Sequence, residues 1–137
     1  MQGKSIKGDA KMQKSRFDAA LNFGAVTLGA AGTAACANVL QIDKADPSYR
    51  AVNFIVETAA VGGTSVQLLI QGSNDNSTYV TVAESPVILE AKLVKDANFD
   101  VHIPQDWNYK YMRAAVTGVG THTAGKITAC MDVYPGV

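Results

Sequence analysis

Apolar and polar residues alternate along most of the chain from residue 37 onward. In residues 64–71, Val66, Leu68 and Ile70 fall on one face of an extended chain, and Leu69 alone breaks the alternation. The same period of two occurs in residues 50–58, 99–103 and 126–133. Because successive side chains of a strand point to opposite faces, this pattern is typical of antiparallel strands that bury one face.

Residues that favour turns separate the alternating segments at short intervals. These segments, rich in Gly, Asn, Asp and Pro, are residues 46–48, 62–63, 72–76, 95–98, 104–106 and 118–120. Between them the pattern predicts strands at about residues 23–29, 35–42, 49–59, 64–71, 78–84, 87–94, 99–103 and 108–117, with a ninth near 126–134. About eight short strands at this spacing predict an all-β, antiparallel β-sandwich or barrel. The one helical candidate is residues 9–21, where Met12, Phe17 and Leu21 can share a face.

The distribution of charge divides the chain into two parts, although the 12 basic and 12 acidic residues cancel overall. Residues 1–16 hold five basic residues against one acidic residue, a net charge of +4. Residues 17–137 hold seven against eleven, a net charge of −4. We interpret residues 1–16 as an extended basic N-terminal arm and residues 17–137 as one folded domain. The arm is either a solvated tail or a segment that orders against an acidic neighbour.

The composition excludes several classes of protein. With 47% hydrophobic and 18% charged residues, the chain can build a packed core and is too poorly charged for a disordered protein. A pI near 6.7 argues against a domain that coats nucleic acid. Residues 23–37 follow basic residues as an export signal does, but they are rich in Gly, Ala and Thr and too short to span a membrane. We therefore expect neither nucleic acid nor a membrane as a partner.

Residues with catalytic or metal-binding chemistry are sparse. His102 and His122 are the two histidines, and neither has a second ligand at a zinc-binding spacing. The sequence contains no nucleophile elbow, phosphate-binding loop or dinucleotide fingerprint. Residues 74–76 could offer oxygen atoms to calcium, but a turn that uses Asn and Asp side chains explains them better. We expect no catalytic site, no metal and no cofactor.

Two cysteines and three aromatic residues leave alternatives open. Cys36 and Cys130 lie among apolar residues, which favours buried thiols, although a disulfide between the first and last strands is also compatible. Trp107, Tyr109 and Tyr111 occur at every second position, so a regular strand would place them on one face. That face would either fill the core or a subunit interface, or form a platform that binds sugar.

Four segments resemble the capsid cement proteins of short-tailed bacteriophages. Residues 21–43 form a strand of small Ala and Thr residues that leads into Asn38-Val39, and residues 68–75 fit the middle of the same family. Residues 110–118 and 123–129 are similar to its closing pair of strands, in which an aromatic residue and an arginine begin the first strand. The likeness covers about residues 17–134, and the basic arm is longer than the family's opening.

The resemblance implies a jelly-roll β-sandwich that is a structural virion protein and not an enzyme. Such proteins sit on the outside of the head, bridge neighbouring major capsid subunits, and associate as dimers or trimers about a symmetry axis. The chain would be made in the cytoplasm of the host bacterium. The capsid-binding candidates are the basic residues of the arm and three of the body: Lys4, Lys7, Lys11, Lys14, Arg16, Arg50, Arg113 and Lys126.

The middle of the chain also resembles discoidin-type carbohydrate-binding domains, which are jelly rolls as well. There Gly-Ser-Asn-Asp, here residues 72–75, precedes an aromatic residue and a strand, and Tyr79 stands where a tryptophan is expected. Residues 110–113 resemble the arginine-bearing strand of that family. This alternative changes the partner to a glycan, bound by Trp107, Tyr109 and Tyr111, and leaves the predicted fold unchanged.

Overall fold

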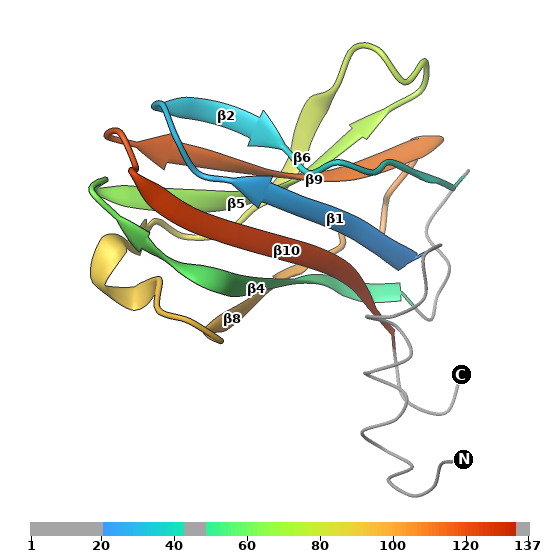
Figure 1. The fold of residues 1–137 in the computed structure, drawn as a ribbon. Coiled ribbons are helices and arrows are strands. Elements are labelled where there is room, and N and C mark those ends of the chain that lie inside the picture. The colour runs from blue at the N-terminus through green and yellow to red at the C-terminus, as the bar shows by residue number, and fades with distance from the viewer. Residues whose placement is uncertain (1–20, 43–48, 134–137) are drawn as a thin grey trace, which may run out of the picture.

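Two antiparallel sheets pack face to face in the computed structural model of the protein, which describes residues 21–42 and 49–133 (Figure 1). The elements are β1 (Asn22–Thr27), β2 (Gly32–Ala35), β3 (Leu40–Gln41), β4 (Tyr49–Val61), β5 (Ser65–Ser73), β6 (Val80–Glu84), β7 (Ile88–Leu89), the 3₁₀ turn η2 (Glu90–Lys92), β8 (Asn98–His102), β9 (Tyr111–Val119) and β10 (Ala124–Val133). Within the described residues, no helix is long and apolar enough to cross a lipid bilayer.

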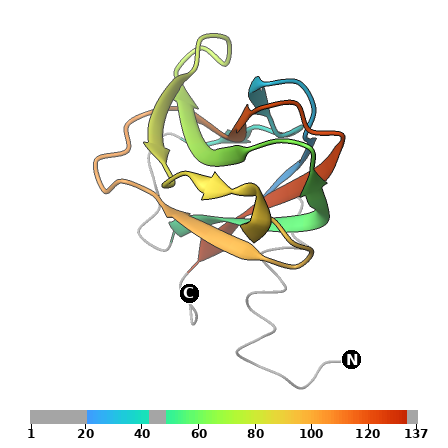
Figure 2. The same ribbon diagram turned by 90° about the vertical axis from the view of Figure 1, so that its left-hand side faces the viewer.

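The order of the strands is that of a jelly roll. Sheet A has the order β1-β10-β4-β8, and sheet B has the order β2-β9-β5-β6, with β3 paired to β9 and β7 paired to β5. When β2 with β3 and β6 with β7 are each taken as one interrupted strand, eight strand positions remain, four in each sheet. The chain then changes sheet at every connection except the β5–β6 hairpin, whose loop projects beyond the sandwich (Figures 1 and 2). The predicted all-β sandwich of jelly-roll type is confirmed.

The core lies between the inner faces of the two sheets. Val66, Leu68 and Ile70 of β5 point into it together, as the alternation predicted. They meet the inner-face residues of sheet A, among them Phe54 and Met131, which are fully buried. Each such side chain contributes about 1.5–3 kcal/mol through the apolar surface that it removes from water. The burial of one face along every long strand therefore sets the register of the sandwich.

Three predicted strands are wrong in their extent. The segment 35–42 is broken between β2 and β3. At Asn38 the backbone pairs with sheet A instead of sheet B, because its N–H donates to the Phe23 carbonyl of β1 at 2.8 Å. The segment 87–94 continues only to Leu89 and then forms η2, where the Leu93 N–H donates to the Glu90 carbonyl at 3.0 Å. The strand predicted over 108–117 begins at Tyr111.

The other predicted strands agree with the structure to within a few residues. The helical candidate over 9–21 lies almost entirely outside the described residues, as do the predicted turn at 46–48 and the basic arm over 1–16.

Candidate functional surface

Arg50 is bound within sheet A. Its guanidinium hydrogen-bonds to Asp132, whose side chain is almost completely buried, and lies 3.6 Å from the Asp100 carboxylate. The Asn53 amide donates to the same Asp100 carboxylate at 2.8 Å. Because this carboxylate cluster already engages the guanidinium, Arg50 is poorly suited to bind an external acid.

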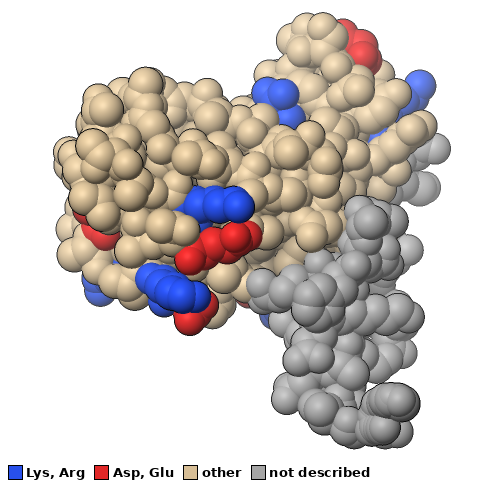
Figure 3. Space-filling view, viewed as in Figure 1, with Lys and Arg blue, Asp and Glu red and all other residues tan. Residues whose placement is uncertain are grey.

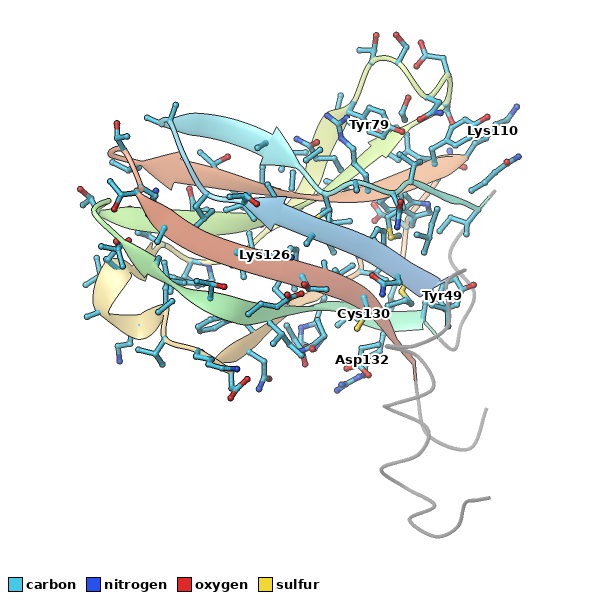
Figure 4. All side chains as sticks on the ribbon, viewed as in Figure 1. Tyr49, Tyr79, Lys110, Lys126, Cys130 and Asp132 are labelled. Carbon is cyan, nitrogen blue, oxygen red and sulfur yellow. The ribbon has the colours of Figure 1, made fainter. Side chains whose placement is uncertain are left out.

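Lys126 also has an acidic neighbour in its own sheet. Its Nζ lies 3.7 Å from Glu57 Oε1, and both side chains are nearly half exposed. Basic and acidic atoms lie side by side on this part of the surface, and Lys126 projects from β10 (Figures 3 and 4). An exposed pair of this kind contributes at most about 1 kcal/mol to stability. It nevertheless reduces the positive charge that Lys126 presents to a partner.

Arg113 is held differently, on the outer face of sheet B. Its Nε donates to Gln71 Oε1 at 2.8 Å, and its Cζ lies 3.9 Å from the centroid of the Tyr79 ring. No carboxylate of the described residues forms an ion pair with it, and its two terminal nitrogens have no hydrogen-bond partner among those residues. We call Gln71, Tyr79 and Arg113 the Tyr79–Arg113 site.

The β5–β6 loop positions Tyr79 through a turn built on Asp75. The Asp75 carboxylate accepts the backbone N–H groups of Thr78 and Ser77, each at 2.9 Å, and the Ser73 hydroxyl at 2.8 Å. These hydrogen bonds, those of Thr78 and Ser77 first, lower the pKa of Asp75. The predicted turn over residues 74–76 is confirmed, and it returns the chain so that Tyr79 lies directly before β6, which pairs with β5 (Figure 4).

Two further hydrogen bonds orient the side chains of Tyr79 and Gln71. The Tyr79 hydroxyl donates to Asn76 Oδ1, which ties the ring to the loop. Burial raises the pKa of Tyr79, although the charge of Arg113 acts in the opposite direction. The Gln71 amide that supports Arg113 is itself 3.4 Å from Thr81 Oγ1 of β6. The stacked phenol is therefore neutral at neutral pH and presents its electron-rich face to the cation.

Sheet B carries little charge. Its strands contain only two charged residues, Glu84 and Arg113, whereas the strands of sheet A contain Arg50, Glu57, Asp100, Lys126 and Asp132. The strand register places two rows side by side on the outer face of sheet B. The first, Thr33, Thr117 and Gln67, is uncharged and at least partly exposed, and the second runs from Ala35 through the buried Ala115 and Leu69 to Glu84. This face is the candidate interaction surface of the molecule.

The apolar end of the same face lies away from the Tyr79–Arg113 site. Leu89 and Val119 flank Ser65 across β5 in register. The Leu89 and Val119 side chains are 59% and 53% exposed. The face thus runs from exposed aliphatic side chains at one end to an anchored arginine at the other.

The three aromatic residues considered for sugar binding do not share one environment. Trp107 is buried in the core cluster, and its Nε1 donates to the Tyr109 carbonyl at 2.9 Å. The Trp107 and Tyr109 rings meet edge to face with centroids 5.4 Å apart, and both cover Gly72. Tyr109 and Tyr111 are each partly buried, and only Tyr111 belongs to β9.

His122 has a structural role that the sequence pattern did not reveal. Its imidazole is buried, its Nε2 lies 2.9 Å from Glu90 Oε1, and the ring covers Gly63, whose N–H donates to Glu90 Oε2 at 3.0 Å. These contacts join the β4–β5 turn, η2 and the β9–β10 turn. The glycines in segments 62–63 and 118–120 were the sequence signal for this packing, because the His122 ring can lie against the backbone only where side chains are absent. His102 is exposed on β8.

Cys36 and Cys130 are both buried thiols and no disulfide joins them, so that interpretation is confirmed. Among the described residues, no group of three or more His, Cys, Asp or Glu side chains is placed to hold a metal ion. The five basic residues of the arm, which were capsid-binding candidates, lie outside the described residues.

Burial raises the pKa of the Cys36 thiol to about 12. The unfolded thiol ionises near pH 8.5, so the folded state keeps its proton over a pH range in which the unfolded state loses it. We therefore expect the free energy of unfolding to fall above pH 9, by about 1.4 kcal/mol per pH unit from this group. In urea titrations from pH 8 to 10.5, the Cys36→Ala variant should lose less stability than the wild type. Parallel curves for the two proteins would contradict this assignment.

Comparisons with known proteins support a family and a fold. The model of the Bbp16 family, whose name is phage-related, matches residues 22–131. The crystal structure of PirA superposes with a TM-score of 0.51 at 14% sequence identity, covering 79% of this chain and 91% of that one. At this identity the similarity to PirA concerns the fold alone. A search of curated protein sequences found no match.

Proposed function

The chain belongs to the Bbp16 family, and from this premise we propose that it is a structural protein on the outside of a bacteriophage head, where it cements neighbouring major capsid subunits. Support comes from the phage-related family name, the jelly-roll sandwich and the resemblance of its strands to phage cement proteins. In this role the protein has no catalytic site.

The outer face of sheet B is the observation that carries this proposal. The central parts of protein interfaces are depleted in charged residues and enriched in aromatic residues and arginine. Sheet B matches that composition, since its strands hold only two charged residues and one of them is an arginine stacked on a tyrosine. Sheet A, with its internally paired charges, is the poorer interface.

Repetition on the shell explains how a small protein can cement a capsid. Each copy needs only a modest contact with each of two subunits, because both contacts act together once one of them has formed. A dimer or trimer about a symmetry axis of the shell would increase the number of contacts that act together. Such a bridge would oppose the separation of subunits under pressure from inside the head.

The basic arm adds a second means of attachment. Its charge of +4 suits an acidic groove on the shell, and such complementarity raises the association rate more than the final affinity. Screening by salt should weaken this contribution, since exposed charges interact over only about 10 Å at 0.1 M salt.

Mixing the purified protein with heads that were assembled without it tests both parts of the proposal. We expect electron microscopy to show regular decoration of the outer surface. Deleting residues 1–16 should slow association about tenfold at low salt and less at high salt, because it removes electrostatic steering. A variant with Lys4, Lys7, Lys11 and Lys14 replaced by glutamine is the control that separates charge from length.

The experiment distinguishes failure of the cement function from failure of the role of the arm. Heads that stay undecorated by the wild-type protein would contradict the cement function. Normal decoration with unchanged association of the deletion variant would remove the arm from the mechanism and leave the function standing.

A further inference from the structure

We propose that the Tyr79–Arg113 site binds a carboxylate from an acidic side chain of the partner protein. This inference rests on the proposed function, in which that partner is the capsid shell, and it names the chemistry of one contact.

The guanidinium of Arg113 is fixed by contacts that leave its binding edge open. The Nε–H bond to Gln71 fixes the inner edge, and the Tyr79 ring covers one face at 3.9 Å. The two terminal nitrogens of the guanidinium have no hydrogen-bond partner among the described residues. These nitrogens form a planar fork that matches the two oxygens of a carboxylate.

Immobilisation of Arg113 before binding favours a tight contact. A flexible arginine loses rotamer freedom when it pairs, and this loss reduces affinity. Here the stacked ring and the Gln71 amide have already restricted the side chain. Arg50 and Lys126, by contrast, are each paired with carboxylates of sheet A and would have to exchange one partner for another.

The acid closest in sequence to Tyr79 is occupied elsewhere. Asp75 directs its carboxylate to the backbone N–H groups of Ser77 and Thr78, and no ion pair joins it to Arg113 within the described parts of the chain. Glu84 of β6 stands opposite Leu69, one row away, and forms no ion pair with Arg113 either. An incoming carboxylate therefore meets a cation that forms no ion pair with a carboxylate of the described residues.

The surroundings of the site strengthen a charged contact made there. Thr117, which is partly exposed, and Ala115 and Leu69, which are buried, lie beside Arg113 and Gln71 on the outer face of β9 and β5. A partner that covers the partly exposed Arg113 and Tyr79 would exclude water from the ion pair, and hydrogen-bonded ion pairs in a water-excluded interface centre are typical hot spots of binding. Arg113 is thus the single residue of this face whose replacement should weaken binding most.

Binding to heads assembled without the protein tests the proposal with three variants. Arg113→Lys keeps the charge and removes the planar fork, and we expect a loss of affinity of about 30-fold, as for a hot-spot residue. Arg113→Ala should lose at least as much. Lys95→Gln removes one positive charge from an exposed turn and is the matched control, with affinity expected within twofold of wild type. Thermal unfolding of each variant checks that the fold is retained.

Chemical modification of the shell tests the class of ligand. When exposed carboxylates of the heads are converted to neutral amides, the ratio of wild-type to Arg113→Ala affinity should fall from about 30 to near 1. An unchanged ratio would overturn the carboxylate assignment.

Failure of this inference is distinct from failure of the proposed function. If wild-type protein decorates heads and Arg113→Lys binds equally well, the site is wrong and the function stands. If the wild-type protein binds no heads, the function itself fails. An Arg113-dependent signal on a glycan array without binding to heads would overturn both in favour of sugar recognition.

Discussion

Replacing Gly63 with alanine is expected to lower the free energy of unfolding by about 3 kcal/mol, the upper range for overpacking of a close-packed site. A Cβ at this position would lie 2.2 Å from His122 Nε2 and 2.4 Å from Cε1, far inside van der Waals contact. The imidazole has little room to move, since it is buried and bonded to Glu90. The β4–β5 and β9–β10 turns would have to separate.

Chemical denaturation at pH 7 measures this effect, and the chain offers a matched control. A Cβ at Gly29 would meet no atom within 4 Å, so Gly29→Ala should change stability by less than about 0.5 kcal/mol. Adding His122→Ala to Gly63→Ala should recover part of the loss, because it removes the clashing ring. Equal stability of the two glycine variants would show that His122 does not pack against Gly63.

Replacing Trp107 with alanine should cost about 3–5 kcal/mol, as expected when a large aromatic side chain leaves a cavity in a core. Its side chain is only 4% exposed and belongs to the core cluster, and its ring supports Tyr109 over Gly72. The variant also loses the hydrogen bond from Nε1 to the Tyr109 carbonyl. At roughly 4 °C per kcal/mol, the melting temperature should fall by well over 10 °C.

Far-UV circular dichroism is the suitable probe for variants at this position, because Trp107 is the one tryptophan of the chain and its fluorescence is lost when it is replaced. Trp107→Phe keeps most of the ring volume and loses the N–H donor, so it should cost about 1–2 kcal/mol. Wild-type stability in Trp107→Ala, combined with lost binding on a glycan array, would instead assign the ring to a sugar platform.

The sandwich could be predicted from the sequence because the inner face of its long strands is apolar at every second residue. The alternation of apolar and polar residues follows directly from the burial of that face, as in Val66, Leu68 and Ile70 of β5. The breaks within 35–42 and 87–94 could not be predicted in this way. They depend on a hydrogen bond to another sheet at Asn38 and on the turn after Leu89, which no local pattern records.

The candidate surface was only partly visible in the sequence. Leu69 interrupted the alternation of β5, and the structure places it on the outer face of sheet B beside Ala115, where both side chains are buried. An apolar residue on the outer face was therefore the sequence signal that the centre of this face is also apolar. The pairing of Arg113 with Gln71 and Tyr79 joins β9, β5 and the end of a loop, so it requires the register of three strands.

The position of β1 next to β10 has a consequence for synthesis of the protein. The two strands pair over Asn22–Thr27, yet about a hundred residues separate them in the chain. During translation β1 has no partner in sheet A until β10 has left the ribosome, and its edge is exposed throughout that time. Folds dominated by such distant pairings form in milliseconds to seconds and risk aggregation while incomplete. Slow growth or a chaperone should therefore raise the yield of soluble protein.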